Sequence, residues 1–241
     1  MDNDNKGISE FKKGLEELNI SLDNHQINHF LDYYKLLIEW NKLMNLTSIT
    51  DFKEVITKHF IDSLSLVKVF RPNNEKILDL GTGAGFPGIP LKIAFPNTKI
   101  VLMDSLNKRI NFLNEIIDKL EINDVVAIHG RAEDFGKDQS YREKFDLCTS
   151  RAVARLSVLS EYCIPFVKVG GCFVSYKSDQ ISDELNEAKR AIDILGGKIL
   201  KTEEFDLPGT DIGRSLVLIE KTKNTPKKYP RTAGKPTKEP L

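Results

Sequence analysis

Residues 76–90 read KILDLGTGAGFPGIP, and this stretch decides the fold of the chain. An apolar run that contains Asp79 predicts a short buried strand over 77–80, and the glycines that follow at every second position predict a tight turn. A helical pattern begins near Pro87, whose missing N–H would have no partner in a first helical turn anyway. Because free N–H groups at a helix start favour polar or anionic ligand groups, the stretch predicts a nucleotide-like cofactor site.

Two cofactor classes compete for this glycine turn. Gly83, Gly85 and Gly88 fit the G-x-G-x-x-G pattern of dinucleotide sites, which would make the protein an NAD-dependent oxidoreductase. Asp79 followed by Gly81, Gly83 and Gly85 instead resembles motif I of S-adenosylmethionine-dependent methyltransferases. Asp79 favours the second class, because a carboxylate suits the ammonium group of S-adenosylmethionine and would meet a pyrophosphate unfavourably.

Polar residues at the ends of three further predicted strands belong to the same candidate site. Asp104 ends the strand over 100–103, roughly 20 residues beyond the glycines, where an acid can hold ribose hydroxyls. Ala132 and Glu133 follow the strand over 125–129 and could frame an adenine, although an exposed polar loop would read the same way. Arg151 follows the strand over 145–149, where we expect the transferable methyl group. Its planar fork could hold a cofactor carboxylate or the target base, although a surface arginine at a strand end is the alternative. Lys177, at the end of the strand over 172–176, is a candidate RNA contact.

Strand and helix patterns alternate after a clear break at 71–74, and they predict an α/β fold. Helices are expected over about 87–95, 108–120, 153–166 and 179–195, with a turn over 168–171 and final strands over 198–205 and 215–220. This order predicts a parallel, doubly wound, Rossmann-like sheet that ends in an antiparallel pair. Ligands on such sheets bind beyond the carboxyl ends of the strands, where the four polar segments above converge.

Residues 1–72 read as a helical extension, with no strand signal, that either packs on the sheet or forms a separate cap. His59, Asp62 and Ser63 lie three and four residues apart in the last of its helices, so a helical period puts them on one face. We expect this face to close over the cofactor and contact the substrate, while a merely solvated polar face is the alternative. The cofactor-binding domain then covers 73–221.

Residues 222–241 form a basic tail in which Glu239 is the only acid. Prolines argue against a helix there, so we expect an extended or partly disordered segment. Basic segments of this kind bind phosphate backbones, and Tyr229 could stack on a base, which makes Tyr229 and Arg231 candidate RNA contacts. A solubilising tail would have the same composition.

Composition gives the remaining expectations. Lysine plus arginine and aspartate plus glutamate each number 35, so no overall basic charge indicates nucleic acid. The polar start and the lack of a long apolar stretch predict a cytoplasmic protein without a membrane segment. The 3 cysteines are scattered among apolar neighbours, which indicates buried thiols and neither a disulfide framework nor a metal site. Nothing in the sequence indicates an obligate dimer, so we expect a monomer.

Particular motifs run from the N-terminal helices to the last residue, and together they carry a family resemblance. They are Asn45-Leu46-Thr47, HFIDSL at 59–64, LDLGTGAGFPG at 78–88, Asp104-Ser105 with Lys108-Arg109, Arg131-Ala132-Glu133, Ser150-Arg151-Ala152, and the ending with Tyr229-Pro230-Arg231, Gly234, Pro236 and Pro240-Leu241. In these motifs the chain closely resembles the RsmG (GidB) family of ribosomal RNA small-subunit methyltransferases. The Gly-Phe-Pro-Gly continuation and the C-terminal ending are the most particular parts of the match.

The resemblance implies a Rossmann-like class I methyltransferase sheet and methyl transfer from S-adenosylmethionine to N7 of one guanine in the 530 loop of 16S RNA. It also implies that 16S RNA or the small ribosomal subunit is the partner of the basic tail. Cofactor contacts carried over by motif fall on Gly81, Phe86, Ala132, Glu133 and Arg151. Guanine N7 has a lone pair and no proton, so no general base is required, while Arg151 or Lys177 could donate to O6. A non-catalytic RNA-binding assembly factor with the same fold is the second alternative.

Overall fold

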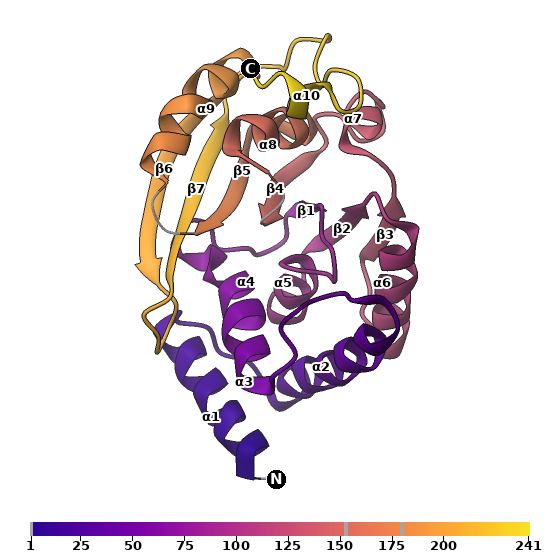
Figure 1. The fold of residues 1–241 in the computed structure, drawn as a ribbon, viewed down its shortest axis with the longest axis vertical. Helices are drawn as coiled ribbons and strands as arrows, with labels where there is room; N and C mark the ends of the chain where they lie inside the picture. The colour runs from indigo at the N-terminus through magenta and orange to yellow at the C-terminus, as the bar shows by residue number, and fades with distance from the viewer. Residues whose placement is uncertain (1, 152–153, 179–180) are drawn as a thin grey trace.

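A seven-stranded sheet runs through the middle of the molecule in the order β3-β2-β1-β4-β5-β7-β6 (Figure 1). The computed structural model describes residues 2–151, 154–178 and 181–241. The strands are β1 (Lys76–Leu80), β2 (Lys99–Asp104), β3 (Val125–His129), β4 (Phe145–Arg151), β5 (Val167–Ser178), β6 (Gly197–Asp206) and β7 (Gly213–Lys221). The first five pair in parallel, and β7 runs antiparallel to both β5 and β6. This arrangement confirms the predicted α/β fold with its antiparallel ending.

Helices cover both faces of this sheet. Neighbouring residues of a strand point to opposite faces, so consecutive apolar residues pack against helices on opposite sides. Ile77 of β1 belongs to a hydrophobic cluster that includes residues of four helices, α1 (Asp2–Glu17), α2 (Asn24–Met44), α5 (Gly88–Ala94) and α6 (Asn107–Lys119). Leu78, the next residue, packs with α8 (Leu156–Cys163) and α9 (Ser182–Ile194). The near-continuous apolar character of β1 therefore reflects burial on both faces.

The N-terminal helices share one hydrophobic core with the sheet. Phe11, Phe30 and Phe60 pack together, with ring centroids 4.9 Å apart for Phe11 and Phe30 and 5.0 Å apart for Phe30 and Phe60. The same cluster contains Ile77 and Leu147 of the sheet, so residues 1–72 pack on the sheet and do not stand apart as a cap.

Several local features differ from the sequence predictions. β5 already begins at Val167, so the expected turn over 168–171 lies within a strand, and short helices α7 (Ala132–Phe135) and α10 (Lys235–Lys238) were not predicted. Pro236 is tolerated in α10 because it lies in the first turn. The η3 turn (Ile164–Phe166) follows α8. Ala152 and the expected helix starts at 153 and 179 lie outside the described residues.

The tail over 222–241 was predicted to be extended or partly disordered; the structure shows it packed against the domain, with one short helix, so the disordered alternative is not what the structure shows. It lies over α7 and α8 at the top of Figure 1. Tyr229 of the tail belongs to the hydrophobic cluster that lies between the sheet and helices α8 and α9. The prediction failed because composition shows the surplus of lysines and does not show how the apolar residues between them pack.

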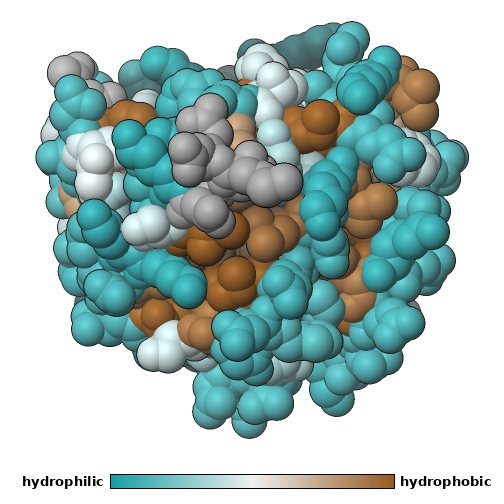
Figure 2. Space-filling model, turned by 90° about the horizontal axis from the view of Figure 1, so that it is seen from below, coloured by the Kyte–Doolittle hydropathy of each residue, from teal (hydrophilic) through white to brown (hydrophobic). Residues whose placement is uncertain are grey.

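The opposite end of the molecule, on the side of α1 and α2, has a mainly hydrophilic surface with hydrophobic side chains exposed near its middle (Figure 2). Among the described helices, none has both the length and the apolar character needed to cross a membrane. In the same described ranges, no cluster of three or more histidine, cysteine, aspartate or glutamate residues could hold a metal ion.

Candidate functional site

A cavity of about 590 Å³ opens at the carboxyl ends of the parallel strands β1 to β4. This volume lies within the usual range for small-molecule sites. Its lining includes seven residues predicted to bind the cofactor, namely Gly81, Gly83, Phe86, Asp104, Ala132, Glu133 and Arg151, together with His59. Four segments far apart in the sequence therefore meet at one place, as the strand order predicted.

The glycine turn after β1 shows why glycine is needed at particular positions. Gly81, Gly83 and Gly85 have φ values of 71°, 60° and 100°, which other residues rarely adopt. A Cβ atom added at Gly83 would have no neighbour within 4 Å, so this residue faces the open cavity. A Cβ atom at Gly85 would lie 2.7 Å from Ile89 and 2.8 Å from the Tyr33 hydroxyl. Gly83 thus leaves room for a ligand, whereas Gly85 packs inward and does not line the cavity.

Asp79 occupies a different position from the one expected. Its side chain is fully buried, and its Oδ2 atom accepts hydrogen bonds from the Thr82 hydroxyl at 2.6 Å and the Gly88 amide at 2.8 Å. Burial raises the pKa of Asp79 to about 6, although the bonds from Thr82 and Gly88 act in the opposite direction. The structure therefore corrects the predicted contact with a cofactor ammonium group: Asp79 holds the turn from beneath.

Asp104 is held at the cavity wall by three donors. Its Oδ2 atom accepts from the Gly83 amide at 2.9 Å and from Arg109 at 3.0 Å, and its Oδ1 atom accepts from the Leu106 amide at 2.9 Å. Only 3% of the residue is exposed, yet it lines the cavity. A carboxylate fixed in this way suits the paired hydroxyls of a ribose. Arg109 was missed as a site residue, although its place in the first turns after the acid was a usable signal.

The far wall of the cavity comes from α7 and α8. Ala132 and Glu133 begin α7, and Tyr162 of α8 lies in the same lining. One oxygen of Glu133 accepts a hydrogen bond from the Gly234 amide in the tail at 3.1 Å. Tyr162 was not predicted, because no local pattern distinguishes it from other aromatic residues on a buried helix.

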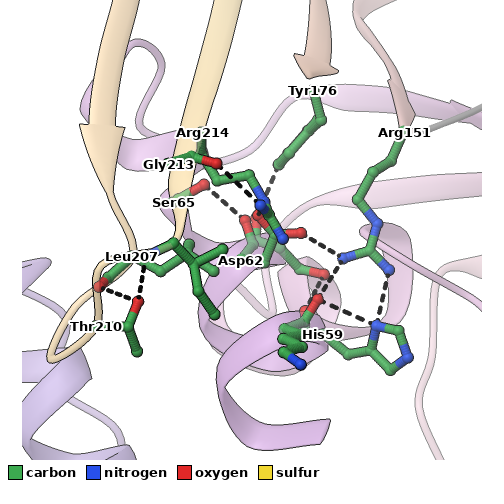
Figure 3. A network of polar contacts seen from close by, with 12 residues as sticks. His59, Asp62, Ser65, Arg151, Tyr176, Leu207, Thr210, Gly213 and Arg214 are labelled. Carbon is green, nitrogen blue, oxygen red and sulfur yellow. Dashed lines mark hydrogen bonds and ion pairs between the residues drawn. The ribbon is translucent and has the colours of Figure 1, made fainter. Parts of the chain in front are cut away.

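Arg151 lies in a polar network between the sheet and the N-terminal helices (Figure 3). Its guanidinium donates to Asp62 at 2.8 Å and approaches the His59 ring nitrogen Nδ1 at 3.3 Å. Arg214 of β7 donates to the other oxygen of Asp62 at 3.0 Å. One buried carboxylate thus fixes two arginines, and Arg214 was not predicted because β7 is distant in sequence.

His59 forms a wall of the cavity next to this network. Its ring stacks on Phe86 with centroids 4.4 Å apart, and its Nε2 atom lies 2.9 Å from the Thr47 hydroxyl. Burial, with the Arg151 guanidinium close by, lowers the pKa of His59 to about 3. The imidazole is therefore neutral at physiological pH, which makes it an aromatic surface and a hydrogen-bonding group.

The segment that carries His59 is not the regular helix that was predicted. It consists of α3 (Phe52–Val55), the π-helix η1 (Ile56–Ile61), α4 (Asp62–Leu64) and the 3₁₀ turn η2 (Ser65–Lys68). Ser63 is fully buried and its hydroxyl donates to the His59 carbonyl at 2.5 Å. The structure thus brings His59 and Asp62 to the site and corrects the assignment of Ser63 as a substrate contact.

A second cavity of about 610 Å³ adjoins the first, and His59 and Arg151 line both. Its wall also carries Asp62, Lys177 and Arg214. Lys177, predicted to contact RNA or substrate, is mostly buried and donates to Glu184 at 2.5 Å and to the Ala154 carbonyl at 2.6 Å. Cationic side chains therefore surround this cavity, and each is held in place by an acid.

Tyr229 and Arg231 are not available to RNA in this structure, which corrects their assignment. Tyr229 is 7% exposed, and Arg231 forms an ion pair with the buried Glu161 through contacts of 2.6 to 3.1 Å. Both residues anchor the tail, because the Tyr229 ring buries apolar surface and the Arg231 guanidinium forms charge-assisted hydrogen bonds with Glu161.

A family model described as rRNA small subunit methyltransferase G matches residues 26–212. The ribosomal RNA small subunit methyltransferase G of Lachnoclostridium phytofermentans is 55% identical over 234 residues, which cover 97% of each protein. The proteins of the same name from Acetivibrio thermocellus and Lactococcus lactis are each 51% identical, over 95% and 96% of this chain and 94% and 98% of their own.

Solved structures with a similar fold are far more distant in sequence. A SAM-dependent methyltransferase from Aquifex aeolicus aligns with a TM-score of 0.54 and 15% identity, over 73% of this chain and 97% of its own. TrmN from Thermus thermophilus aligns with a TM-score of 0.51 and 13% identity, over 69% and 53%. At these identities the likeness shows the fold alone, and that fold is the predicted class I methyltransferase sheet.

Proposed function

Because the chain belongs to the rRNA small subunit methyltransferase G family, we propose that it transfers a methyl group from S-adenosylmethionine to RNA of the small ribosomal subunit. One observation supports this most directly. A cavity with a glycine turn at one end and two buried acids along its walls joins a second cavity edged by cations, and Arg151 stands between them. The first cavity suits a nucleoside cofactor and the second suits an anionic RNA substrate.

The residues of the first cavity fit S-adenosylmethionine. The open space at Gly83 admits a ligand against the backbone, and the fixed carboxylate of Asp104 would accept hydrogen bonds from ribose hydroxyls. Ala132, Glu133 and Tyr162 would enclose the adenine. When bound, the cofactor supplies an electrophilic methyl group. The chain's own residues bind and orient the cofactor. The stacked rings of Phe86 and His59 form the wall that would exclude water from it.

The second cavity is where we place the target base. Arg151 and Arg214 are oriented by Asp62, and Lys177 by Glu184, so the cations are fixed before substrate arrives. Preorganised donors of this kind stabilise developing charge without further rearrangement. In this role Arg151, with Lys177 as a second donor, is the candidate for contact with the base, and His59 and Asp62 shape the approach.

For the acceptor atom, we infer N7 of a guanine in the 530 loop of 16S RNA, as the resemblance in sequence motifs implies. The state of the candidate bases supports this choice. His59 has a pKa of about 3, Asp62 is shared by two arginines, and Glu184 is paired with Lys177. None of these three groups is a free, basic proton acceptor, which suits an atom that attacks through its own lone pair. Alignment of the reactants then supplies the main acceleration, and such alignment is worth about 7–11 kcal/mol in favourable cases.

The direct test is methyl transfer from labelled S-adenosylmethionine to small-subunit RNA from a strain that lacks this protein, with mapping of the modified base. We expect one N7-methylguanine in the 530 loop. Arg151→Lys keeps the charge but loses the planar fork, so it should lower the rate while cofactor affinity stays within a few-fold. Binding of S-adenosylhomocysteine with no label on naked RNA or subunits would contradict the proposed function and favour an assembly factor. Preferential binding of NAD would favour an oxidoreductase.

A further inference from the structure

Three contacts connect the C-terminal tail to the wall of the cofactor cavity. The Gly234 amide donates to Glu133 at 3.1 Å, and the Thr237 hydroxyl lies 3.0 Å from the Tyr162 hydroxyl. Both Glu133 and Tyr162 line the cavity. The third contact is the ion pair of Arg231 with Glu161, the residue directly before Tyr162 in α8. The tail therefore touches the cavity wall from outside.

The tail is also fixed upstream of these contacts. The Arg142 guanidinium donates to the carbonyls of Thr225 and Tyr229, each at 2.7 Å, and to the carbonyl of Gly136 at 2.8 Å. Because Gly136 ends α7, one side chain joins the tail to the helix that carries Glu133. The buried ring of Tyr229 adds a hydrophobic anchor. Residues 231–238 thus leave from a fixed point and cross α7 and α8, as Figure 1 shows.

Charge within the tail separates two sets of residues. The first set is Arg231, which pairs with a buried acid, because only 1% of the Glu161 side chain is exposed. Lys227, Lys228, Lys235 and Lys238 are exposed. A surface for RNA would use the exposed lysines, whereas Arg231 pairs with the buried Glu161 and Thr237 contacts Tyr162 of α8.

We propose that residues 231–238 act as a strap that positions Glu133 and Tyr162 for cofactor binding, with Arg231 and Thr237 as positioning residues. This inference rests on the proposed function, because the ligand of the cavity is taken to be S-adenosylmethionine. A ligand that touches Glu133 and Tyr162 binds best when the strap is seated, and by linkage its binding stabilises the seated strap. The tail therefore controls affinity for the cofactor as well as any contact with RNA.

The first experiment measures the affinity for S-adenosylhomocysteine by calorimetry after removal of residues 231–241. This deletion keeps Tyr229 and the bonds of Arg142, and Glu161→Gln in the same chain removes the buried carboxylate that would otherwise be unpaired. We expect the dissociation constant to rise at least about tenfold, because Glu133 loses its hydrogen bond from the tail and a bond to a charged group is worth that much or more. A far-ultraviolet melting curve establishes that the shortened chain is folded.

Point variants separate positioning from general stability. Thr237→Val in the full chain removes one hydroxyl at the surface, and it should raise the KM for S-adenosylmethionine a few-fold while kcat at saturating cofactor stays unchanged. Thr237→Ser should restore the wild-type KM. Lys227→Gln is the matched control, because it removes an exposed tail charge outside the strap and should leave cofactor affinity unchanged.

Hydrogen exchange supplies the reciprocal test. Adding S-adenosylhomocysteine to the full chain should slow exchange of amides over 231–238, including the Gly234 amide that bonds Glu133. If the shortened chain is folded and binds with wild-type affinity, or if no protection appears in the tail, the strap is refuted. If the full chain itself fails to bind S-adenosylhomocysteine, the proposed function fails instead, so the two failures are distinguishable.

Discussion

Asp79 has a structural role that a charge-neutral residue of the same shape could perform. Its Oδ2 atom receives the Thr82 hydroxyl and the Gly88 amide, and its Oδ1 atom lies 3.3 Å from the Thr149 hydroxyl. Asp79→Asn should keep the two bonds to Oδ2, with its NH2 group donating to the Thr149 hydroxyl, and retain cofactor affinity within a few-fold. Asp79→Ala leaves buried donors unpaired and should lower the unfolding free energy by about 1–3 kcal/mol. Calorimetry measures the cofactor affinity of Asp79→Asn, and urea unfolding measures the stability of Asp79→Ala. A complete loss of binding in Asp79→Asn would support the original prediction that Asp79 contacts the cofactor ammonium group.

His59 makes stability depend on pH in a defined window. The folded state keeps the imidazole neutral down to about pH 3, whereas the unfolded chain takes up a proton near 6.5. The unfolded state therefore binds more protons between these values, and His59 lowers stability as pH falls from about 6.5 toward 3. Asp79 acts in the opposite sense, because its folded pKa of about 6 exceeds the ordinary value of 3.8.

His59→Gln isolates the histidine contribution, since Asp79 is present in both proteins. The difference in unfolding free energy between wild type and variant should change by up to about 1.4 kcal/mol per pH unit between pH 6.5 and 4, in favour of the variant as pH falls. Urea unfolding at several pH values measures it. His129→Gln, at an exposed position, serves as the control and should track the wild type. A pH-independent difference for His59→Gln would contradict the assignment.

At the scale of elements, the glycine turn offers a matched pair of substitutions. Gly83→Ala puts a methyl group into open cavity, so it should weaken cofactor binding at least tenfold, with about 1 kcal/mol of strain from its positive φ. Gly85→Ala meets Ile89 and Tyr33 at under 3 Å and should cost clearly more stability. Thermal unfolding and ligand calorimetry on both variants check this contrast. Equal effects of the two substitutions on stability and on cofactor affinity would contradict the assignment of Gly83 to ligand binding and Gly85 to packing.

The same elements show what a sequence can predict. The strands β1 to β4 were predicted because short apolar runs are followed by glycines after Leu80, by Asp104, and by polar residues after His129 and Thr149. Their convergence followed from parallel topology alone. The π-helix over Ile56–Ile61 was not predicted, because the helical spacing of this segment was interpreted as one regular helix. The same spacing predicted Ser63 at the site, whereas the structure buries it.

At the scale of the whole molecule, the sequence could not show which distant residues complete the site. Tyr162, Arg214 and the folded tail reach it through contacts across 70 to 152 positions, as the pairs of Arg231 with Glu161 and of Arg214 with Asp62 show. Such pairs depend on tertiary packing and not on local pattern. The lysine-rich composition of the tail even indicated disorder, because composition weighs all residues alike and ignores where Tyr229 is buried.

The shared core of helices and sheet leads to a prediction for the whole chain. Since Phe11 and Phe60 belong to the same cluster as Ile77, the described part of the chain should unfold in a single transition. S-adenosylhomocysteine at 100 times its dissociation constant should then raise the unfolding free energy by about 2.7 kcal/mol. Scanning calorimetry measures both, with NAD at the same concentration as the control. Two separate transitions would contradict the shared core.

The position of β7 between β5 and β6 has a consequence for assembly of the sheet. β6 precedes β7 in the chain, yet it joins the sheet only through β7. The two strands must therefore dock as a hairpin, and β5 presents an open edge until they do. A nascent or damaged chain that is cut within β7 loses two strands, and its exposed β5 becomes a template on which other chains can pair and aggregate.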